Sequence, residues 1–378
     1  MQNKLNTISF SGELLIKMKN DGIPEERLAL LQKKADALLS SPLYAVTERI
    51  ATAVSGNKHD YCSIGTYWWP NPDTPDGLPY VRRDGETTPA AKDPISYDAM
   101  ADKALTLALA AFYLDNKEYA VASEKTIYDW HLNPETYMTP HAEYSQAIPG
   151  ICTGRGIGVI DFSMRSYKIF DAVGILDYLG CISEENLTAL KKWYSDFTDW
   201  MLTSEKGLTE ECELNNHGTY YDVHILSAAI FTGRTELAKK ICTTAYARRI
   251  RSQIEPDGAQ PLELARTMAM VYSLSNLRAF SLLANIADAC GYSEYWGYDE
   301  KFGAPALKKA IDFIYPYFKN PEAFPYQEIN PSGVPKSMLD RLMTLSAHFE
   351  SEGYAERADE ILKTVPDYAA DWFYIPLK

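Results

Sequence analysis

Apolar residues recur every three to four positions along most of the chain, which is the period of a helix that buries one face. Residues 96–114 show this well, because a serine precedes a long apolar run, as is common where a helix begins. The same pattern predicts helices over residues 24–40, 96–114, 117–130, 162–179, 183–202, 216–231, 234–253, 267–290, 303–318, 336–351 and 353–364. Strand-like alternation is rare, so the sequence predicts an all-α fold.

The predicted helices have similar lengths and are joined by short turns, which favours helical hairpins. Such hairpins either stack as a solenoid or close into an α/α toroid. No fixed sequence period is present, which disfavours a regular repeat array. No glycine–serine linker divides the chain, so we expect residues 1–378 to form one domain.

Two segments interrupt the helical pattern. Residues 61–95 are rich in Pro, Gly and Asp, yet they contain Tyr67, Trp68, Trp69, Arg82 and Arg83. A loop this long is usually functional or disordered, and its aromatic content argues against disorder. It either packs over one end of the helices or forms a lid-like wall of a sugar cleft. Residues 139–161 contain a glycine-rich run that fits neither a P-loop nor a dinucleotide fingerprint.

Composition narrows the class of protein. The chain is 46% hydrophobic and 23% charged, as in ordinary globular proteins. Aromatic residues reach 12%, which suits either a large core or surfaces that stack on sugar rings. The net charge of −14 argues against nucleic acid binding. A polyanionic ligand would need a local cluster of basic residues, with acids such as Glu25, Glu26 and Glu184 on the outside.

Neither a metal nor a membrane is indicated. The six cysteines form no CxxC pair, so we expect buried free thiols rather than a zinc site. No apolar run is long enough to span a bilayer. The first residues lack the apolar core of a signal peptide. The chain is therefore expected to be periplasmic or secreted with its leader replaced, or else cytoplasmic.

Residues 210–224 hold the densest polar cluster. On a helix that starts near Asn216, the side chains of Asn216 and Tyr220 lie one turn apart, as do those of His217 and Tyr221. The cluster is either a capped helix with a satisfied histidine or a functional site, and its density favours a site. His217 and His224 are seven residues apart, which gives little support for a metal site.

A second candidate segment covers residues 255–273. Thr267 is expected to cap the following helix, with Arg266 just before it and Tyr272 in its first turns. On spacing alone, Arg266 is expected to pair with Glu263, and Tyr272 to belong to the core.

A family resemblance changes this interpretation. The run Asn-Asn-His-Gly-Thr-Tyr-Tyr-Asp at 215–222 resembles the Asn-Asn-His signature of the alginate lyase superfamily. Residues 63–83 are especially similar to polysaccharide lyase family 38, which is related to family 5. Arg266 and Tyr272 follow at the expected distance, so the similarity spans about residues 60–290. The resemblance implies an α/α toroid, an incomplete barrel of six to seven hairpins, with a cleft across it.

The resemblance also implies metal-independent β-elimination of a uronate polymer, without a cofactor. Proton abstraction at C5 builds negative charge beside a carboxylate, which must first be neutralised or hydrogen-bonded. Asn216, His217 and Arg266 suit this task, and Tyr272 matches the family tyrosine that acts as base and acid. Arg266 and a protonated His217 are expected to favour the phenolate of Tyr272.

Further residues are expected to bind an acidic polysaccharide or oligosaccharide substrate. Three aromatic residues would stack on sugar rings, four arginines would meet carboxylates, and other polar residues would complete the groove. These candidates are Tyr67, Trp68, Trp69, Arg82, Arg83, Arg155, Arg165, Gln146, Tyr220, Tyr221 and Glu210. In β-D-mannuronate H5 and O4 leave from the same side, so one tyrosine can serve both steps. We therefore expect a preference for mannuronate or glucuronate, with His217 as base in the guluronate case.

Two other functions are compatible with the residues. A glycoside hydrolase on the same toroid needs two carboxylates, which Glu210, Glu211, Glu213, Asp222 and Asp257 are available to supply. A non-catalytic protein that binds acidic sugars would use the same groove. Formation of an unsaturated product separates the lyase from both.

Overall fold

The computed structural model describes residues 4–365 and consists mainly of helices. Five of them follow one another in contact and bury residues on almost every side: α3 (Tyr97–Leu114), α6 (Ser166–Tyr178), α9 (Asn216–Thr232), α12 (Ala269–Ala289) and α14 (Val334–Ser346). A helix that is apolar all round is typical of an inner layer.

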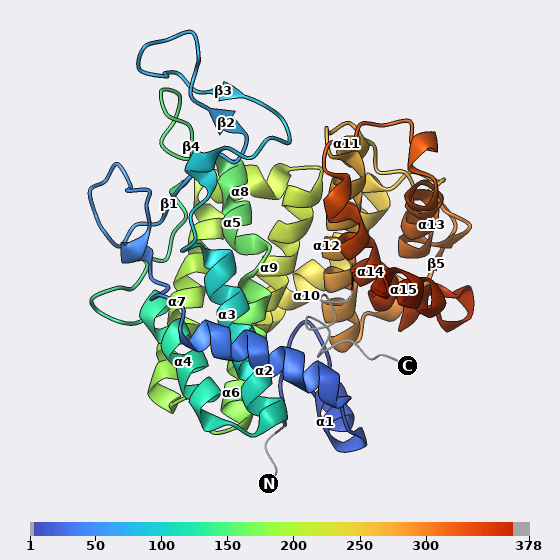
Figure 1. Ribbon diagram of the computed structural model, residues 1–378, viewed down its shortest axis with the longest axis horizontal. Helices are drawn as coiled ribbons and strands as arrows, with labels where there is room; N and C mark the ends of the chain where they lie inside the picture. The colour runs from blue at the N-terminus through green and yellow to red at the C-terminus, as the bar shows by residue number, and fades with distance from the viewer. Residues whose placement is uncertain (1–3, 366–378) are drawn as a thin grey trace.

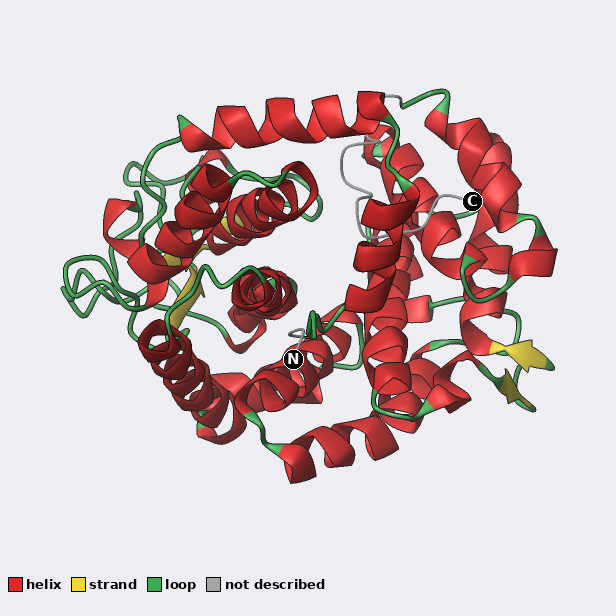
Figure 2. Cartoon of the chain, turned by 90° about the horizontal axis from the view of Figure 1, so that it is seen from below, coloured by secondary structure: helices red, strands yellow, loops and turns green. Residues whose placement is uncertain are grey.

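A second set of helices covers this inner layer and buries one face each. They are α2 (Glu25–Leu39), α4 (Lys117–His131), α7 (Glu184–Thr203), α10 (Thr235–Ala245), α13 (Ala306–Lys319) and α15 (Tyr354–Leu362). Figure 2 shows the two layers curving around the molecule. The fold is thus an α/α toroid, and the predicted all-α class is confirmed.

The helix that carries the Asn-Asn-His run is defined at both ends by its own sequence. At its N-terminus, the Asn215 side chain accepts a hydrogen bond from the backbone of His217. At its C-terminus, Gly233 adopts a left-handed conformation (φ 77°), which favours glycine. The predicted bounds of 216–231 are therefore correct to within one residue.

Other helix ends differ from expectation. The helix α12 begins at Ala269 and has no side-chain cap, so the prediction that Thr267 caps it is wrong. The Thr267 hydroxyl instead donates to Asp84. Four short helices were not predicted, because so few turns give little periodicity: α1 (Gly12–Asp21), α5 (Ile160–Ser163), α8 (Glu205–Cys212) and α11 (Pro261–Leu264).

The two segments that interrupt the helical pattern lie together. Strand β1 (Cys62–Ile64) pairs in parallel with β4 (Tyr144–Ala147). Strand β2 (Trp68–Trp69) pairs antiparallel with β3 (Val81–Arg82), and the loop between them projects beyond the helix ends at the top of Figure 1. A third pair, β5 (Tyr298–Asp299) and β6 (Ala304–Pro305), lies away from them. Both long loops therefore stand at one end of the toroid.

All six cysteines are free thiols, as predicted, but only Cys62 and Cys242 are buried, whereas Cys152 and Cys181 are half-buried and Cys212 and Cys290 are exposed. Glu25, Glu26 and Glu184 lie on the outside, as expected. Within residues 4–365, no helix combines the length and apolar character needed to cross a membrane.

Candidate active site

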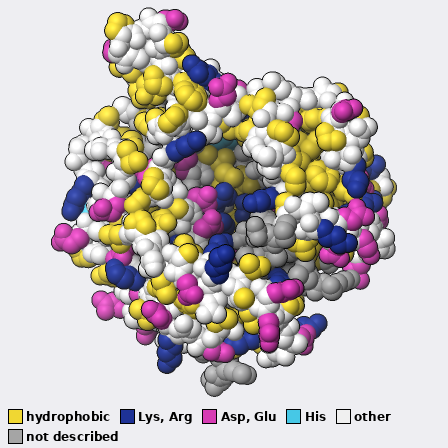
Figure 3. All heavy atoms as spheres, in the orientation of Figure 1, with side chains coloured by type: hydrophobic (Ala, Val, Ile, Leu, Met, Phe, Trp, Pro, Cys, Tyr) yellow, Lys and Arg dark blue, Asp and Glu magenta, His cyan; other side chains and the backbone are white. Residues whose placement is uncertain are grey.

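A cavity of about 620 Å³ lies beneath the projecting loop. Figure 3 shows the hollow from outside, with basic and acidic side chains around its mouth. Its wall combines the loop 61–95, the segment around β4, the start of α9 and the start of α12. Segments far apart in sequence thus supply one concave, polar site, which is where small-molecule and sugar sites usually occur.

His217 enters the cavity from the first turn of α9. Its Nδ1 lies 3.2 Å from both carboxylate oxygens of Glu210, which is fully buried in α8. Burial alone would lower the pKa of His217, but the carboxylates of Glu210, Glu263 and Glu213 together outweigh it and raise that pKa. For Glu210, burial has the opposite effect and raises the pKa of the carboxyl group. The pair therefore holds a proton, and Nε2 is the ring nitrogen left for a ligand.

Asn216, beside His217, is also held by a buried glutamate. The Glu263 carboxylate accepts the Asn216 backbone N–H at 2.7 Å and its side-chain Nδ2 at 2.9 Å. Glu263 is 1% exposed, and burial raises its pKa. The expected pairing of Glu263 with Arg266 is wrong, because Glu263 points to α9 instead.

Arg266 and Tyr272 meet on another part of the cavity wall. The Arg266 Nη2 lies 3.2 Å from the Tyr272 hydroxyl, and the guanidinium stands 4.2 Å from the centre of the Tyr272 ring. The Tyr272 hydroxyl also bonds to the Tyr67 hydroxyl from the loop. Tyr272 lines the cavity, so its assignment to the core on spacing alone is wrong.

The protonation state of Tyr272 differs from expectation. Burial, followed by the neighbouring Tyr67, raises the pKa of Tyr272 well above that of free tyrosine, although Arg266 lowers it. Arg266 thus favours the phenolate, as expected, but burial outweighs this effect in the protein without substrate. Tyr272 is a neutral phenol in this state, and proton loss must await a change on substrate binding.

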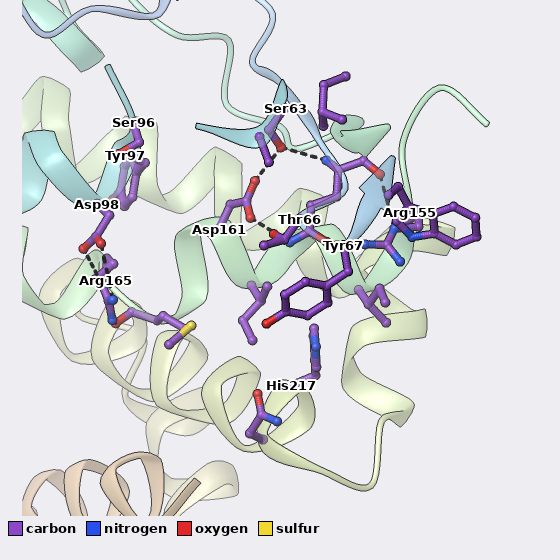
Figure 4. Close-up of a pocket in the computed structure, with 18 of the residues that line it drawn as sticks. Ser63, Thr66, Tyr67, Ser96, Tyr97, Asp98, Arg155, Asp161, Arg165 and His217 are labelled. Atoms are coloured by element: carbon purple, nitrogen blue, oxygen red, sulfur yellow. Dashed lines mark hydrogen bonds and ion pairs between the residues drawn. The ribbon is translucent and has the colours of Figure 1, made fainter. Parts of the chain in front are cut away.

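A network of polar side chains forms a third wall. Asp161 accepts hydrogen bonds from Ser63 at 2.6 Å and from the Gln146 amide at 2.9 Å. Gln146, whose backbone is left-handed at φ 51°, in turn accepts from Arg155. Figure 4 shows this network beside Tyr67 and His217, which face each other across the cavity. The network fixes the Arg155 guanidinium without a direct carboxylate partner among the described residues.

The remaining arginines of the cavity are paired with acids. Arg165 bonds to Asp98 at one end of the pocket, as Figure 4 shows, and Arg82 contacts Asp84 at 2.7 Å. Asp84 also contacts Arg266 at 2.8 Å. The cavity therefore contains acidic as well as basic side chains, whereas the sequence predicted a cluster of basic residues in the groove and acids on the outside.

The structure brings most of the predicted site residues to one cavity. Those that line it are Tyr67, Trp68, Arg82, Gln146, Arg155, Arg165, Asn216, His217, Arg266 and Tyr272. Their roles stay predictions, because position alone does not test them.

Five predicted binding residues do not line the cavity. Tyr220 and Tyr221 are almost fully buried, with hydroxyls bonded to the backbone oxygens of Ser275 and Met201. Glu210 lies behind His217. The Arg83 guanidinium stacks on the Trp69 ring, 4.9 Å from its centre. Tyr220, Tyr221 and Glu210 are buried and therefore do not face the groove, because a helix turns the neighbours of His217 inward. Substrate contacts of Trp69 and Arg83 stay predictions.

Several residues of the site were not anticipated as such, namely Ser63, Asp84, Asp161 and Glu263. Two of them have a signal in the sequence: Asp84 follows an arginine pair in the aromatic loop, and Asp161 ends the glycine-rich segment. Their partners are distant in sequence, so the contacts themselves had no sequence signal. Among residues 4–365, no group of three or more His, Cys, Asp or Glu side chains is placed to hold a metal ion.

The toroid and its polar cavity define a protein of the α/α-toroid class. Residues 45–324 match the family model described as alginate lyase. The chain is 32% identical to an alginate lyase from Bacteroides ovatus of known crystal structure, with a TM-score of 0.91 over 99% of this chain and 100% of that one. The chain therefore belongs to the alginate lyase family of enzymes.

More distant structures share the fold. Two variants of alginate lyase A1-III, each in complex with a tetrasaccharide, are 13% identical, with TM-scores of 0.57 and 0.56. The match covers 86% of this chain and 82% of the first, and 85% and 80% for the second. No curated protein matches the chain.

Proposed function

We propose that this protein is a polysaccharide lyase that cleaves 1,4-linked uronate polymers, alginate above all, by metal-independent β-elimination. The observation that carries the proposal is the position of the Tyr272 hydroxyl, which contacts Arg266 in the cavity that also holds Asn216 and His217. Tyr272, the proposed general base, thus lies in the same cavity as three side chains that can hydrogen-bond the carboxylate of the substrate. The similarity of residues 63–83 to polysaccharide lyase family 38 supports the same assignment at a finer level.

The chemistry follows from the charges. A protonated His217, with Asn216 and Arg266, hydrogen-bonds the carboxylate of the sugar whose C5 proton is removed, and so stabilises the developing enolate. Tyr272 takes this proton and then returns one to O4 of the leaving sugar. Substrate binding must lower the pKa of Tyr272 from its raised value, and the adjacent guanidinium is the group placed to do so.

The same arrangement favours mannuronate. Because H5 and O4 of β-D-mannuronate leave from one side, Tyr272 alone serves as base and acid. Guluronate needs a base on the opposite face, and a His217 that keeps its proton through Glu210 is a poor base. We therefore propose that polymannuronate and glucuronan, in which H5 and O4 leave from the same side, are preferred over polyguluronate.

The test is a spectrophotometric screen on polymannuronate, polyguluronate, glucuronan and hyaluronan. A lyase generates a conjugated uronate that absorbs at about 235 nm. We expect the fastest rise on polymannuronate. Efficient cleavage of polyguluronate with little action on polymannuronate contradicts the preference, and no absorbance on any polymer contradicts the lyase itself.

The hydrolase alternative has less support from the carboxylates. Glu210 is bonded to His217, and both Glu211 and Asp222 form ion pairs with Arg248. These three are engaged within the protein rather than placed across a glycosidic bond. A hydrolase releases reducing ends without absorbance at about 235 nm, so the same screen decides.

A further inference from the structure

Asp84 of the projecting loop reaches across to the start of α12. Its Oδ1 accepts a hydrogen bond from Arg266 Nη2 at 2.8 Å, and its Oδ2 lies 3.3 Å from Arg266 Nε. The same Oδ2 accepts from the hydroxyl of Thr267 at 3.0 Å and from its backbone N–H at 3.3 Å. One carboxylate thus joins the loop to Arg266 and Thr267, which lie shortly before α12.

These bonds decide how the guanidinium of Arg266 is turned. A guanidinium has five N–H groups in one plane, and the carboxylate takes the edge formed by Nε and Nη2. The second N–H of Nη2 is then left for the Tyr272 hydroxyl, 3.2 Å away. No hydrogen bond from Nη1 is present among the described residues, so that end remains for a ligand. The orientation of Arg266 toward Tyr272 therefore depends on Asp84.

The residue after Asp84 shows that close docking is built into the loop. Gly85 has φ 79°, and a Cβ there would lie 2.4 Å from Thr267 Oγ1 and 2.6 Å from Ile329 Cδ1. Any larger residue would force the loop away from Thr267. Only glycine allows the carboxylate of Asp84 to come within hydrogen-bond reach.

We propose that Asp84 is a positioning residue of the reaction, which docks the aromatic loop on Thr267 and aims Arg266 at the Tyr272 hydroxyl. The inference rests on the proposed function, in which Tyr272 transfers the proton. Tyr67, from the same loop, bonds to the same hydroxyl, so docking brings two loop residues to one reacting atom. Asp84 does not itself line the cavity and acts through Arg266.

The experiment compares Asp84→Asn with the full-length wild-type protein on polymannuronate. We expect kcat to fall about 10- to 100-fold, since a small misplacement of a group at the reacting atom has effects of this size. KM should change less than about threefold, because Asn216 and His217 still contact the carboxylate of the substrate. Asp84→Glu, which keeps the charge, should restore part of kcat. A lower KM with unchanged kcat overturns the proposal, since Asp84 would then compete with the substrate carboxylate for Arg266.

Two further variants make the result specific. Asp76→Asn lies in the same loop and should leave kcat unchanged, because within residues 4–365 Asp76 accepts only the backbone N–H of Leu78. Gly85→Ala should reproduce the kcat loss of Asp84→Asn, because it displaces the docking point without removing the carboxylate. Wild-type kcat in Gly85→Ala contradicts the docking.

Hydrogen exchange of peptides that cover residues 63–83 gives a readout independent of activity. We expect faster exchange in Asp84→Asn and in Gly85→Ala, but not in Asp76→Asn. Unchanged exchange in the first two contradicts the docking even if no polymer is cleaved. The two proposals can also fail separately. If the wild type is active, Tyr272→Phe is inactive and Asp84→Asn is fully active, the proposed function stands and this inference is contradicted.

Discussion

The two walls of the cavity are held in different ways. Asn216 and His217 stand on the first turn of a helix buried on almost every side, and each is bonded to a buried glutamate. Arg266 lies just before α12 and Tyr272 lies in its first turn, and their partners Asp84 and Tyr67 come from a long loop. The first wall is part of the core, whereas the second is complete only when the loop is docked.

The carboxylates of the two walls reflect this difference. Burial raises the pKa of Glu210 and of Glu263, and their carboxylates raise the pKa of His217, so the wall formed by Asn216 and His217 (the core wall) favours a protonated imidazole. Partial burial alone would also raise the pKa of Asp84, but hydrogen bonds from Arg266 and Thr267 hold it well below its ordinary value. The core wall is thus suited to neutralising a substrate carboxylate, and the loop wall to organising the proton transfer.

The largest effect is expected on the loop wall, from Tyr272→Phe. Loss of the hydroxyl removes both base and acid, so kcat should fall about 1,000-fold or more while oligosaccharide binding persists. Initial rates of absorbance increase at about 235 nm measure kcat, and calorimetry measures oligosaccharide binding.

Tyr220→Phe is the matched control for that change. The Tyr220 hydroxyl bonds to the backbone oxygen of Ser275 in the interior, so its loss should lower stability by about 1 kcal/mol and leave kcat within about twofold. A Tyr272→Phe protein that keeps wild-type kcat would assign the chemistry to another residue.

An intermediate effect is expected on the core wall, from Glu210→Gln. Without the carboxylate, the pKa of His217 falls, so His217 loses its proton at a lower pH than in the wild type. The alkaline decline of kcat/KM should therefore begin at lower pH, with a loss of about 10-fold near pH 8.

The measurement is the pH profile of kcat/KM, with Glu211→Gln on the same helix as control. Glu211 contacts Arg248 outside the cavity and should leave the profile unchanged. A Glu210→Gln profile that matches the wild type, or moves to higher pH, contradicts a protonated His217.

A smaller effect is expected on substrate affinity, from Arg155→Ala. Arg155 lines the cavity and is held by Gln146 rather than by a carboxylate, so its charge is available to a uronate. We expect KM to rise about 10-fold with a small change in kcat. Arg83→Ala, at a residue that stacks on Trp69 and does not line the cavity, should change KM less than about twofold. Equal effects of the two changes would place the substrate outside the cavity.

The smallest effect on activity, and a clear one on stability, is expected from His224→Phe on α9. Burial lowers the pKa of His224 to about 3, so the folded state keeps it neutral while the unfolded chain takes up a proton below about pH 6.5. Wild-type stability from this group is therefore present above pH 6.5 and is lost as pH falls toward 3.

In urea unfolding, the loss of stability between pH 7 and pH 5 should be about 2 kcal/mol smaller for His224→Phe than for the wild type. The phenyl ring is expected to fit beside Phe197, whose ring centre lies 5.5 Å away. Identical pH dependence of the two proteins contradicts a neutral buried histidine.

Helical periodicity was sufficient for most of the fold. The caps of α3 and α9 were readable because Ser96 and Asn215 bond to backbone groups two or three residues away. The π-helical turn at Tyr246–Arg251, which continues α10, had no such local signal. Short helices such as α8 were missed for the same reason.

The sequence by itself determined the helical class and, through family resemblance, the residues Asn216, His217, Arg266 and Tyr272. Local side-chain chemistry and helical spacing act over a few residues, so the sequence displays them directly. It could not decide which neighbours face the cavity, as the burial of Tyr220 and Tyr221 shows.

Only the tertiary structure decided the partners of the site residues. Asp84 and Arg266 are 182 residues apart, and Tyr67 and Tyr272 are 205 apart. Such contacts arise when the toroid brings a loop over the start of a distant helix, and no local pattern records them. The tertiary structure also reversed the expected pKa of Tyr272, because burial depends on everything that surrounds a side chain rather than on its neighbours in sequence.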